Sequence, residues 1–83
     1  MRDAPYWWDW ELVMSPHVVK RMASRDISEL DIRDMAERAD GWSFDPYPGR
    51  VRLHTTMNGR AWRIVVEPQE NIEAIEVVTT FAV

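Results

Sequence analysis

Hydrophobic and polar residues alternate along three stretches of the chain, and this alternation predicts strands. In residues 5–14, PYWWDWELVM, an extended segment would place on one face Tyr6, Trp8, Trp10, Leu12 and Met14, and on the other Trp7, Asp9, Glu11 and Val13. Further along, Asn58-Gly59 separates two alternating runs. This dipeptide predicts a hairpin with a two-residue type I′ turn.

A two-residue turn fixes the register of the strands on either side. The turn pairs Met57 with Arg60, and the apolar face then pairs Thr55 with Trp62, Leu53 with Ile64 and Val51 with Val66. The opposite face pairs His54 with Arg63, Arg52 with Val65 and Arg50 with Glu67. If Pro68 to Asn71 form a second loop, a last strand over 72–81 places Ile75 opposite Ile64, Val77 opposite Trp62 and Glu76 opposite Arg63.

Two segments carry helix start signals. Ser15 followed by Pro16 is typical of an N-cap and first helical position, and that helix is expected to end near Arg25. Ser28 with Asp31 three residues later predicts a capping box for a second helix, which would run to Asp40 with Gly41 as its C-terminal cap.

The order strand, helix, helix, strand, strand, strand predicts one α+β domain over residues 1–83. We expect two layers, in which two helices cover one face of a four-stranded antiparallel sheet and leave the other face open.

Charge is unevenly distributed along the chain. The net charge is −4, yet residues 46–66 hold four arginines and no acid, while residues 67–83 hold four glutamates. The middle of the chain is therefore a cationic island that could meet an anionic partner.

Composition also narrows the classes of site. There is no cysteine, the two histidines are far apart, and the three glycines are isolated, so neither a metal site, a cofactor nor a phosphate-binding loop is expected. No apolar run approaches the ~20 residues that span a bilayer. With acidic residues near the N-terminus, we expect a cytoplasmic protein that does not enter membranes.

Two groups of residues are candidate catalytic sites. The better defined of them is a cationic cluster of Arg52, His54 and Arg63, because the predicted register brings these side chains together. Repulsion from the arginines should lower the proton affinity of the histidine, which suits a general base. The alternative is a solvated strand face on which Glu76 pairs with Arg63 and Glu67 pairs with Arg50.

His17, Arg21 and Ser24 or Arg25 form a polar stripe at helical spacing on the first helix. The stripe could hold an imidazole and guanidinium groups beside a scissile phosphate. Alternatively, His17 simply holds its helix in place.

The tryptophans are expected to serve mainly the core. Trp62 must face the core with Ile64, and Trp8 and Trp10 are expected to join it. Trp7 and Trp42 remain open between burial, ligand stacking and a dimer contact.

The segments SPHVVKRMASRDISELDIRDM, GRAWRIVVEP and IEVVTTF resemble the bacterial family known as domain of unknown function 4258. That family is similar to the RelE/ParE-type toxins of toxin–antitoxin modules. The resemblance, with the cationic cluster, implies a toxin-like domain that binds RNA or the ribosome. Such a domain could act as a metal-independent ribonuclease. Its expected protein partner is a cognate antitoxin that neutralises it. The candidate catalytic residues are His54, Arg52, Arg63, His17 and Arg21, and the candidate RNA contacts are Arg50, Arg60 and Arg25.

A protein-interaction module without catalysis is the alternative: antitoxin-like, an immunity protein or a phage-encoded inhibitor. A gyrase-directed toxin of the same fold is a third. The apolar last strand also favours a homodimer that covers it, unless the first strand closes the sheet and Phe81 lies beneath the helices.

Overall fold

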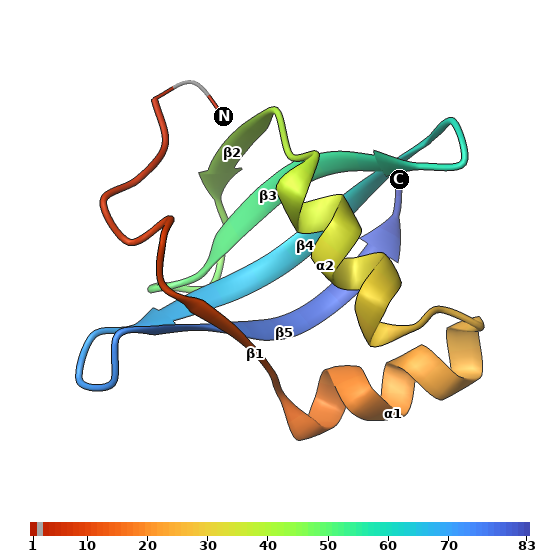
Figure 1. The fold of residues 1–83 in the computed structure, drawn as a ribbon, viewed down its shortest axis with the longest axis horizontal. Helices are drawn as coiled ribbons and strands as arrows, with labels where there is room; N and C mark the ends of the chain where they lie inside the picture. The colour runs from red at the N-terminus through yellow and green to blue at the C-terminus, as the bar shows by residue number, and fades with distance from the viewer. Residues whose placement is uncertain (2) are drawn as a thin grey trace.

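The computed structural model describes Met1 and residues 3–83, which form a two-layer α+β domain with two helices on one face of a sheet (Figure 1). The elements are β1 (Glu11–Met14), α1 (Pro16–Arg25), α2 (Glu29–Glu37), β2 (Gly41–Phe44), β3 (Val51–Met57), β4 (Arg60–Gln69) and β5 (Ala74–Ala82). The predicted α+β class and the two helices are confirmed. Within this part of the chain, neither helix is long and apolar enough to cross a bilayer.

The sheet has five strands in the order β1-β5-β4-β3-β2, with β1 parallel to β5 and the other neighbours antiparallel. The prediction of four antiparallel strands is wrong in the number of strands and in the direction of β1. Alternation shows which residues form a strand but not which way the neighbouring strand runs. The strand that was not predicted, β2, has only four residues. Its first residue, Gly41, was expected to be the C-terminal cap of the second helix.

Both predicted helix starts are confirmed. The Ser15 hydroxyl accepts from the Val18 N–H, and Ser28 and Asp31 form the reciprocal capping box. The predicted end of the second helix is wrong, because α2 stops at Glu37. The Asp40 N–H donates to the His54 carbonyl, which draws the chain into the sheet before the helix could continue.

The first hairpin has the predicted turn and the predicted register. Asn58 and Gly59 have φ values of 52° and 76°, the left-handed conformation that a type I′ turn requires at both positions. His54 therefore lies opposite Arg63, and Leu53 opposite Ile64. Leu53 and Ile64 are buried in the core.

The second hairpin differs from the prediction. β4 continues through Pro68, the turn is formed by residues 70–73, and Ile64 pairs with Thr80 rather than with Ile75. Glu76 consequently lies opposite Glu67, not opposite Arg63. A proline usually marks a strand end, which is why the sequence predicts a turn that begins too early.

β5 contains a bulge, and beyond it each side chain points to the opposite face of the sheet from the one that regular alternation would give. Val66 pairs with Val77 and Val65 with Thr79, so Val78 has no partner in β4. Beyond this point Thr80 faces the core and is fully buried, while Phe81 faces away from the helices. The expectation that Phe81 lies beneath the helices is therefore wrong.

The leader, residues 3–10, forms turns rather than the predicted strand. Its turns are closed by bonds from the Trp8 N–H to the Pro5 carbonyl and from the Trp10 N–H to the Trp7 carbonyl, each 3.0 Å long. Such i to i−3 bonds exclude the extended backbone that alternation suggested. Trp7 is thereby turned into the core, where its side chain is 5% exposed.

Other contacts attach the leader to the domain. The Tyr6 hydroxyl donates to Glu70, and the Trp42 indole donates to the Asp3 carbonyl. Trp42 is half-buried and packs edge-on against Phe44. Trp7 is thus a core residue, whereas Trp42 joins the leader to β2.

Candidate functional site

The sheet face opposite the helices, called the open face here, is formed by the residues that alternate with the core positions. On β3 and β4 it carries Arg52, His54 and Arg63, called the cationic cluster here. Their neighbours Leu53, Ile64 and Val66 point to the helices. β2 and β5 add Ser43 and Phe81 to the same face, because Ser43 pairs with Arg52 and Phe81 with Arg63.

His54 is fixed by residues of β2. Its Nε2 lies 2.8 Å from the Ser43 Oγ, a hydrogen-bonding distance. Its other ring nitrogen, Nδ1, lies beside Gly41, where a Cβ would come within 3.7 Å of it. Ser43 therefore holds one nitrogen of the imidazole, and the missing side chain at Gly41 leaves space beside the other.

The surroundings of His54 favour the neutral imidazole. Burial lowers the pKa of His54 below its ordinary value, and the positive charge of Arg63 lowers it further, with a smaller contribution from Arg52. Asp40 acts in the opposite direction without cancelling the effect. At neutral pH the neutral form of His54 is therefore favoured next to two guanidinium groups, and burial contributes more to this than the repulsion that the sequence analysis considered.

Arg52 is bound to Asp45, an acid in the loop after β2. The Arg52 Nε lies 2.7 Å from the Asp45 Oδ1. The hydrogen bond from Arg52, followed by one from the Tyr47 N–H, holds the pKa of Asp45 below its usual value. The Arg52 guanidinium carbon also lies 5.6 Å from the centre of the Phe81 ring. Arg52 thus links an acid, an aromatic ring and the histidine.

Arg63 has no ion pair within the described residues 1 and 3–83. Its Nη1 donates to the Trp62 carbonyl at 2.9 Å. The predicted pairing with Glu76 is wrong, because the turn at residues 70–73 places Glu76 opposite Glu67. Arg63 is therefore the least neutralised charge of the cationic cluster.

The predicted RNA contacts divide between different parts of the surface. Arg50 pairs with Glu67 at 3.2 Å, as predicted, and its guanidinium carbon lies 4.1 Å from the centre of the Tyr47 ring. Arg60 is exposed at the end of the hairpin. Arg25 lies on α1, where its Nη1 donates to the Thr80 carbonyl.

The stripe on α1 does not join the cationic cluster. His17 and Arg21 are exposed on α1, which packs on the opposite side of the sheet from His54 (Figure 1). The predicted catalytic residues thus belong to two separate surfaces. The cationic cluster on the open face is the candidate site.

Charges of both signs occupy the open face. Beyond the cationic cluster, the same face carries three acids. Glu67 on β4 lies opposite Glu76 on β5, and Glu11 lies on β1. The face is therefore cationic towards β3 and acidic towards β1. Within the described part of the chain, no three acidic or histidine side chains come together as a metal site.

Three residues of the site escaped the sequence analysis: Ser43, Asp45 and Phe81. Ser43 lies between Trp42 and Phe44, and this short alternation was the available signal for β2. Asp45 is the first residue of the proline-rich loop, and an acid so close in sequence to Arg50 and Arg52 was the available signal for an ion pair. Phe81 reaches the open face only through the bulge, for which the sequence carries no clear signal.

Comparison with known proteins gives one family. The family model for the domain of unknown function 4258 matches residues 14–82 and leaves the leader outside the match. No curated protein and no solved structure was found to match the chain. Because the matched residues span most of the sequence, the chain belongs to the family described as domain of unknown function 4258.

Proposed function

We propose that the open face binds RNA and cleaves it without a metal ion, as in a toxin of a toxin–antitoxin module. The observation that carries this proposal is His54, whose pKa is lowered and which lies opposite Arg63 and next to Arg52 on the same face of β3. A proton acceptor beside guanidinium groups is a suitable arrangement for transfer at a phosphodiester. RNA, unlike DNA, supplies its own nucleophile in the 2′-hydroxyl.

In the proposed reaction, His54 removes the proton of a 2′-hydroxyl and the resulting oxygen attacks the adjacent phosphorus. The bond to the 5′-oxygen breaks, and that oxygen takes a proton from solvent. The products are a 2′,3′-cyclic phosphate and a 5′-hydroxyl. Arg63, with Arg52, stabilises the negative charge on the phosphate oxygens. Because Ser43 holds Nε2, the nitrogen beside Gly41 is the one offered to the substrate.

Phe81 supports an RNA ligand in particular. Its ring is half-buried on the open face, opposite Arg63 and close to Arg52. Aromatic rings on a sheet surface stack with unpaired bases, and neighbouring arginines bind the backbone between them. A single-stranded RNA could therefore place one base on Phe81 and its phosphate at the cationic cluster.

Cleavage of a labelled single-stranded RNA in the presence of EDTA tests the catalytic part. The wild-type protein should yield the cyclic phosphate, and His54→Gln should lower the rate by about 10²-fold or more. His17→Gln, the same change on α1, should cleave like the wild type. Equal rates for wild type and His54→Gln would refute the role of His54.

Expression in bacteria tests the toxin assignment. We expect growth arrest that Arg52→Ala with Arg63→Ala relieves, while the variant remains folded. If expression causes no arrest, and the protein cleaves no RNA in a translating extract, the toxin assignment is wrong.

A protein-interaction module is the second candidate, and two ion pairs favour it. Asp45 and Glu67 already neutralise Arg52 and Arg50, and the whole chain has a net charge of −4. Phe44, 79% exposed, and Tyr47, 57% exposed, add apolar surface near the same loop. Purification with a defined protein partner and no RNA would favour this function.

A further inference from the structure

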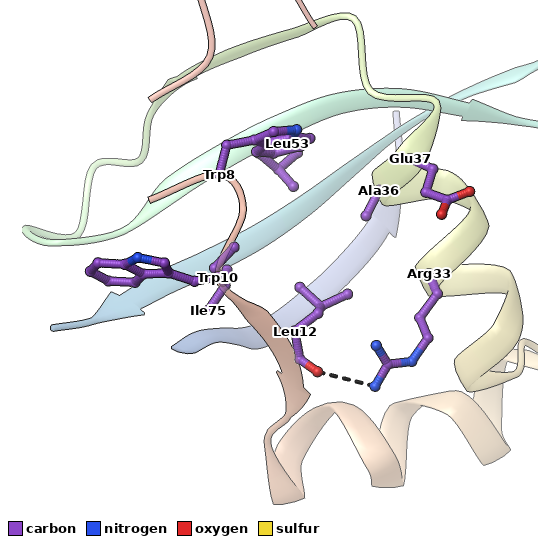
Figure 2. Close-up of a pocket in the computed structure, with 8 residues that line it drawn as sticks. All are labelled: Trp8, Trp10, Leu12, Arg33, Ala36, Glu37, Leu53 and Ile75. Carbon is purple, nitrogen blue, oxygen red and sulfur yellow. Dashed lines mark hydrogen bonds between the residues drawn. The ribbon is translucent and has the colours of Figure 1, made fainter. Parts of the chain in front are cut away.

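A separate pocket lies on the helix side of the sheet. It has a volume of about 310 Å³ and opens between α2 and the segment that joins the leader to β1 (Figure 2). The residues that line it are Trp8, Trp10, Leu12, Arg33, Ala36, Glu37, Leu53 and Ile75. Its size is at the lower end of the range for small-molecule sites.

The interior of the pocket is apolar. Leu53 and Ile75 are buried core residues of the sheet, so the pocket reaches down to the core between the two layers. Figure 2 shows Trp8 above Leu53 on one side and α2 with Ala36 on the other. Trp8, Trp10 and Leu12 precede Met14, where the family match begins. The pocket therefore depends on a part of this chain that the family model does not cover.

Two charged residues, Arg33 and Glu37, line the mouth of the pocket. Arg33 is held in place, because its Nε pairs with Glu29 and its Nη2 donates to the Leu12 carbonyl, each at 3.0 Å. Glu37, one turn further along α2, has no ion pair within the described residues. Glu29, Arg33 and Glu37 together thus leave one carboxylate uncompensated.

We propose that this pocket binds a small organic cation, an ammonium group on an apolar body of about one ring. The apolar body would displace water from Trp8, Leu12 and Ala36, the half-buried apolar residues of the lining. The ammonium group would lie near the Trp8 indole and pair with Glu37. Indole faces attract cations, and a carboxylate at the mouth adds a charge of the opposite sign.

Other head groups fit the mouth less well. A carboxylate would meet Glu37, while two of the Arg33 nitrogens already have partners inside the protein. A hydroxyl would gain the apolar contacts but not the attraction to Glu37. The order of affinity should therefore be ammonium, then hydroxyl, then carboxylate.

Three compounds with the same ring test this order: 2-phenylethylamine, 2-phenylethanol and 3-phenylpropionate. Each is titrated into ¹⁵N-labelled protein while the indole N–H signals are followed. The amine should shift Trp8 and Trp10 but not Trp62, and bind about fivefold more tightly than the alcohol, the effect expected of an exposed ion pair. The carboxylate should bind most weakly.

Glu37→Gln tests whether the carboxylate of Glu37 causes the preference for the amine. It should reduce the preference for the amine over the alcohol to about one and leave the affinity for the alcohol unchanged. Glu73→Gln, an equal charge change in the turn before β5, should keep the preference. Equal binding of amine and carboxylate, an unchanged preference in Glu37→Gln, or no shift with any compound would overturn the proposal. These titrations are independent of RNA binding, because the pocket and the cationic cluster lie on opposite sides of the sheet.

Discussion

Burial and two neighbouring guanidinium groups act on His54 in the same direction, and the consequence can be measured in the stability of the protein. Since the pKa of His54 is lowered in the folded state, the unfolded chain binds a proton more readily. The free energy of unfolding should therefore be fully retained above about pH 6.5 and decrease as the pH falls below it. As the pH falls from about 6.5 towards the lower pKa of His54 in the folded state, protonation of the histidine favours the unfolded chain.

Urea denaturation at about pH 7.5 and about pH 5.5 measures this effect. The wild-type protein should lose stability at the lower pH, and His54→Gln should lose less. His17→Gln, whose side chain is exposed on α1, should behave like the wild type. An identical loss in His54→Gln would show that another group is responsible.

Asp45 competes with any anionic ligand for Arg52, so its removal should strengthen RNA binding. Asp45→Asn abolishes the 2.7 Å ion pair while keeping the side-chain size. We expect about two- to fivefold tighter binding, in keeping with the modest strength of a partly exposed pair. Asp34→Asn on α2 makes the same change of charge and should have little effect. Weaker binding by Asp45→Asn would indicate that the ion pair positions Arg52 for the ligand.

Among the elements, the two hairpins differ in how far the sequence predicts them. Asn58-Gly59 fixes both turn and register, so the pairing of His54 with Arg63 follows from the sequence alone. The bulge at Val78 shifts the second hairpin and brings Phe81 to the open face. A bulge depends on contacts with distant residues, here a bond from the Ser15 hydroxyl to the Val78 carbonyl, so local patterns do not reveal it.

Ser15 should therefore contribute more to stability than an ordinary helix cap. It is buried, accepts from the Val18 N–H and donates to the bulged strand, whereas Ser28 caps α2 at the surface. We expect Ser15→Ala to lower the free energy of unfolding by ~2 kcal/mol and Ser28→Ala by ~1 kcal/mol. Denaturant titration of both variants measures the difference. Equal losses would mean that the bond to Val78 contributes nothing.

At the scale of the whole molecule, the leader completes the core. Trp7 is 5% exposed and belongs to the same cluster as Ile32, Met35 and Ile75. Trp7→Ala should cost ~3–5 kcal/mol, a large part of the roughly 4–12 kcal/mol expected for a domain of this length. Trp7→Phe should cost clearly less. A loss below ~1 kcal/mol for Trp7→Ala would contradict a core role.

The burial of Trp7 also changes the argument for a homodimer. Trp7 is not available as a dimer contact, and β1 covers the first half of β5. The homodimer stays a prediction, with the edge strands β1 and β2 and the second half of β5, which β1 does not cover, as the remaining contacts. Sedimentation at micromolar concentration tests it, since a single species near 9.8 kDa would exclude the dimer.

The salt dependence of RNA binding tests the central claim, that the cationic cluster binds the RNA backbone. Fluorescence anisotropy of a labelled single strand, measured over a series of salt concentrations, gives the slope of log affinity against log salt. Arg52→Ala with Arg63→Ala should weaken binding and reduce this slope by about 1.4, or about 0.7 for each lost phosphate contact. Lys20→Ala with Arg21→Ala removes the same charge from α1 and should leave the slope unchanged. If the cluster variant binds with the affinity and slope of the wild type, or if the wild type does not bind at low salt, the open face is not an RNA site.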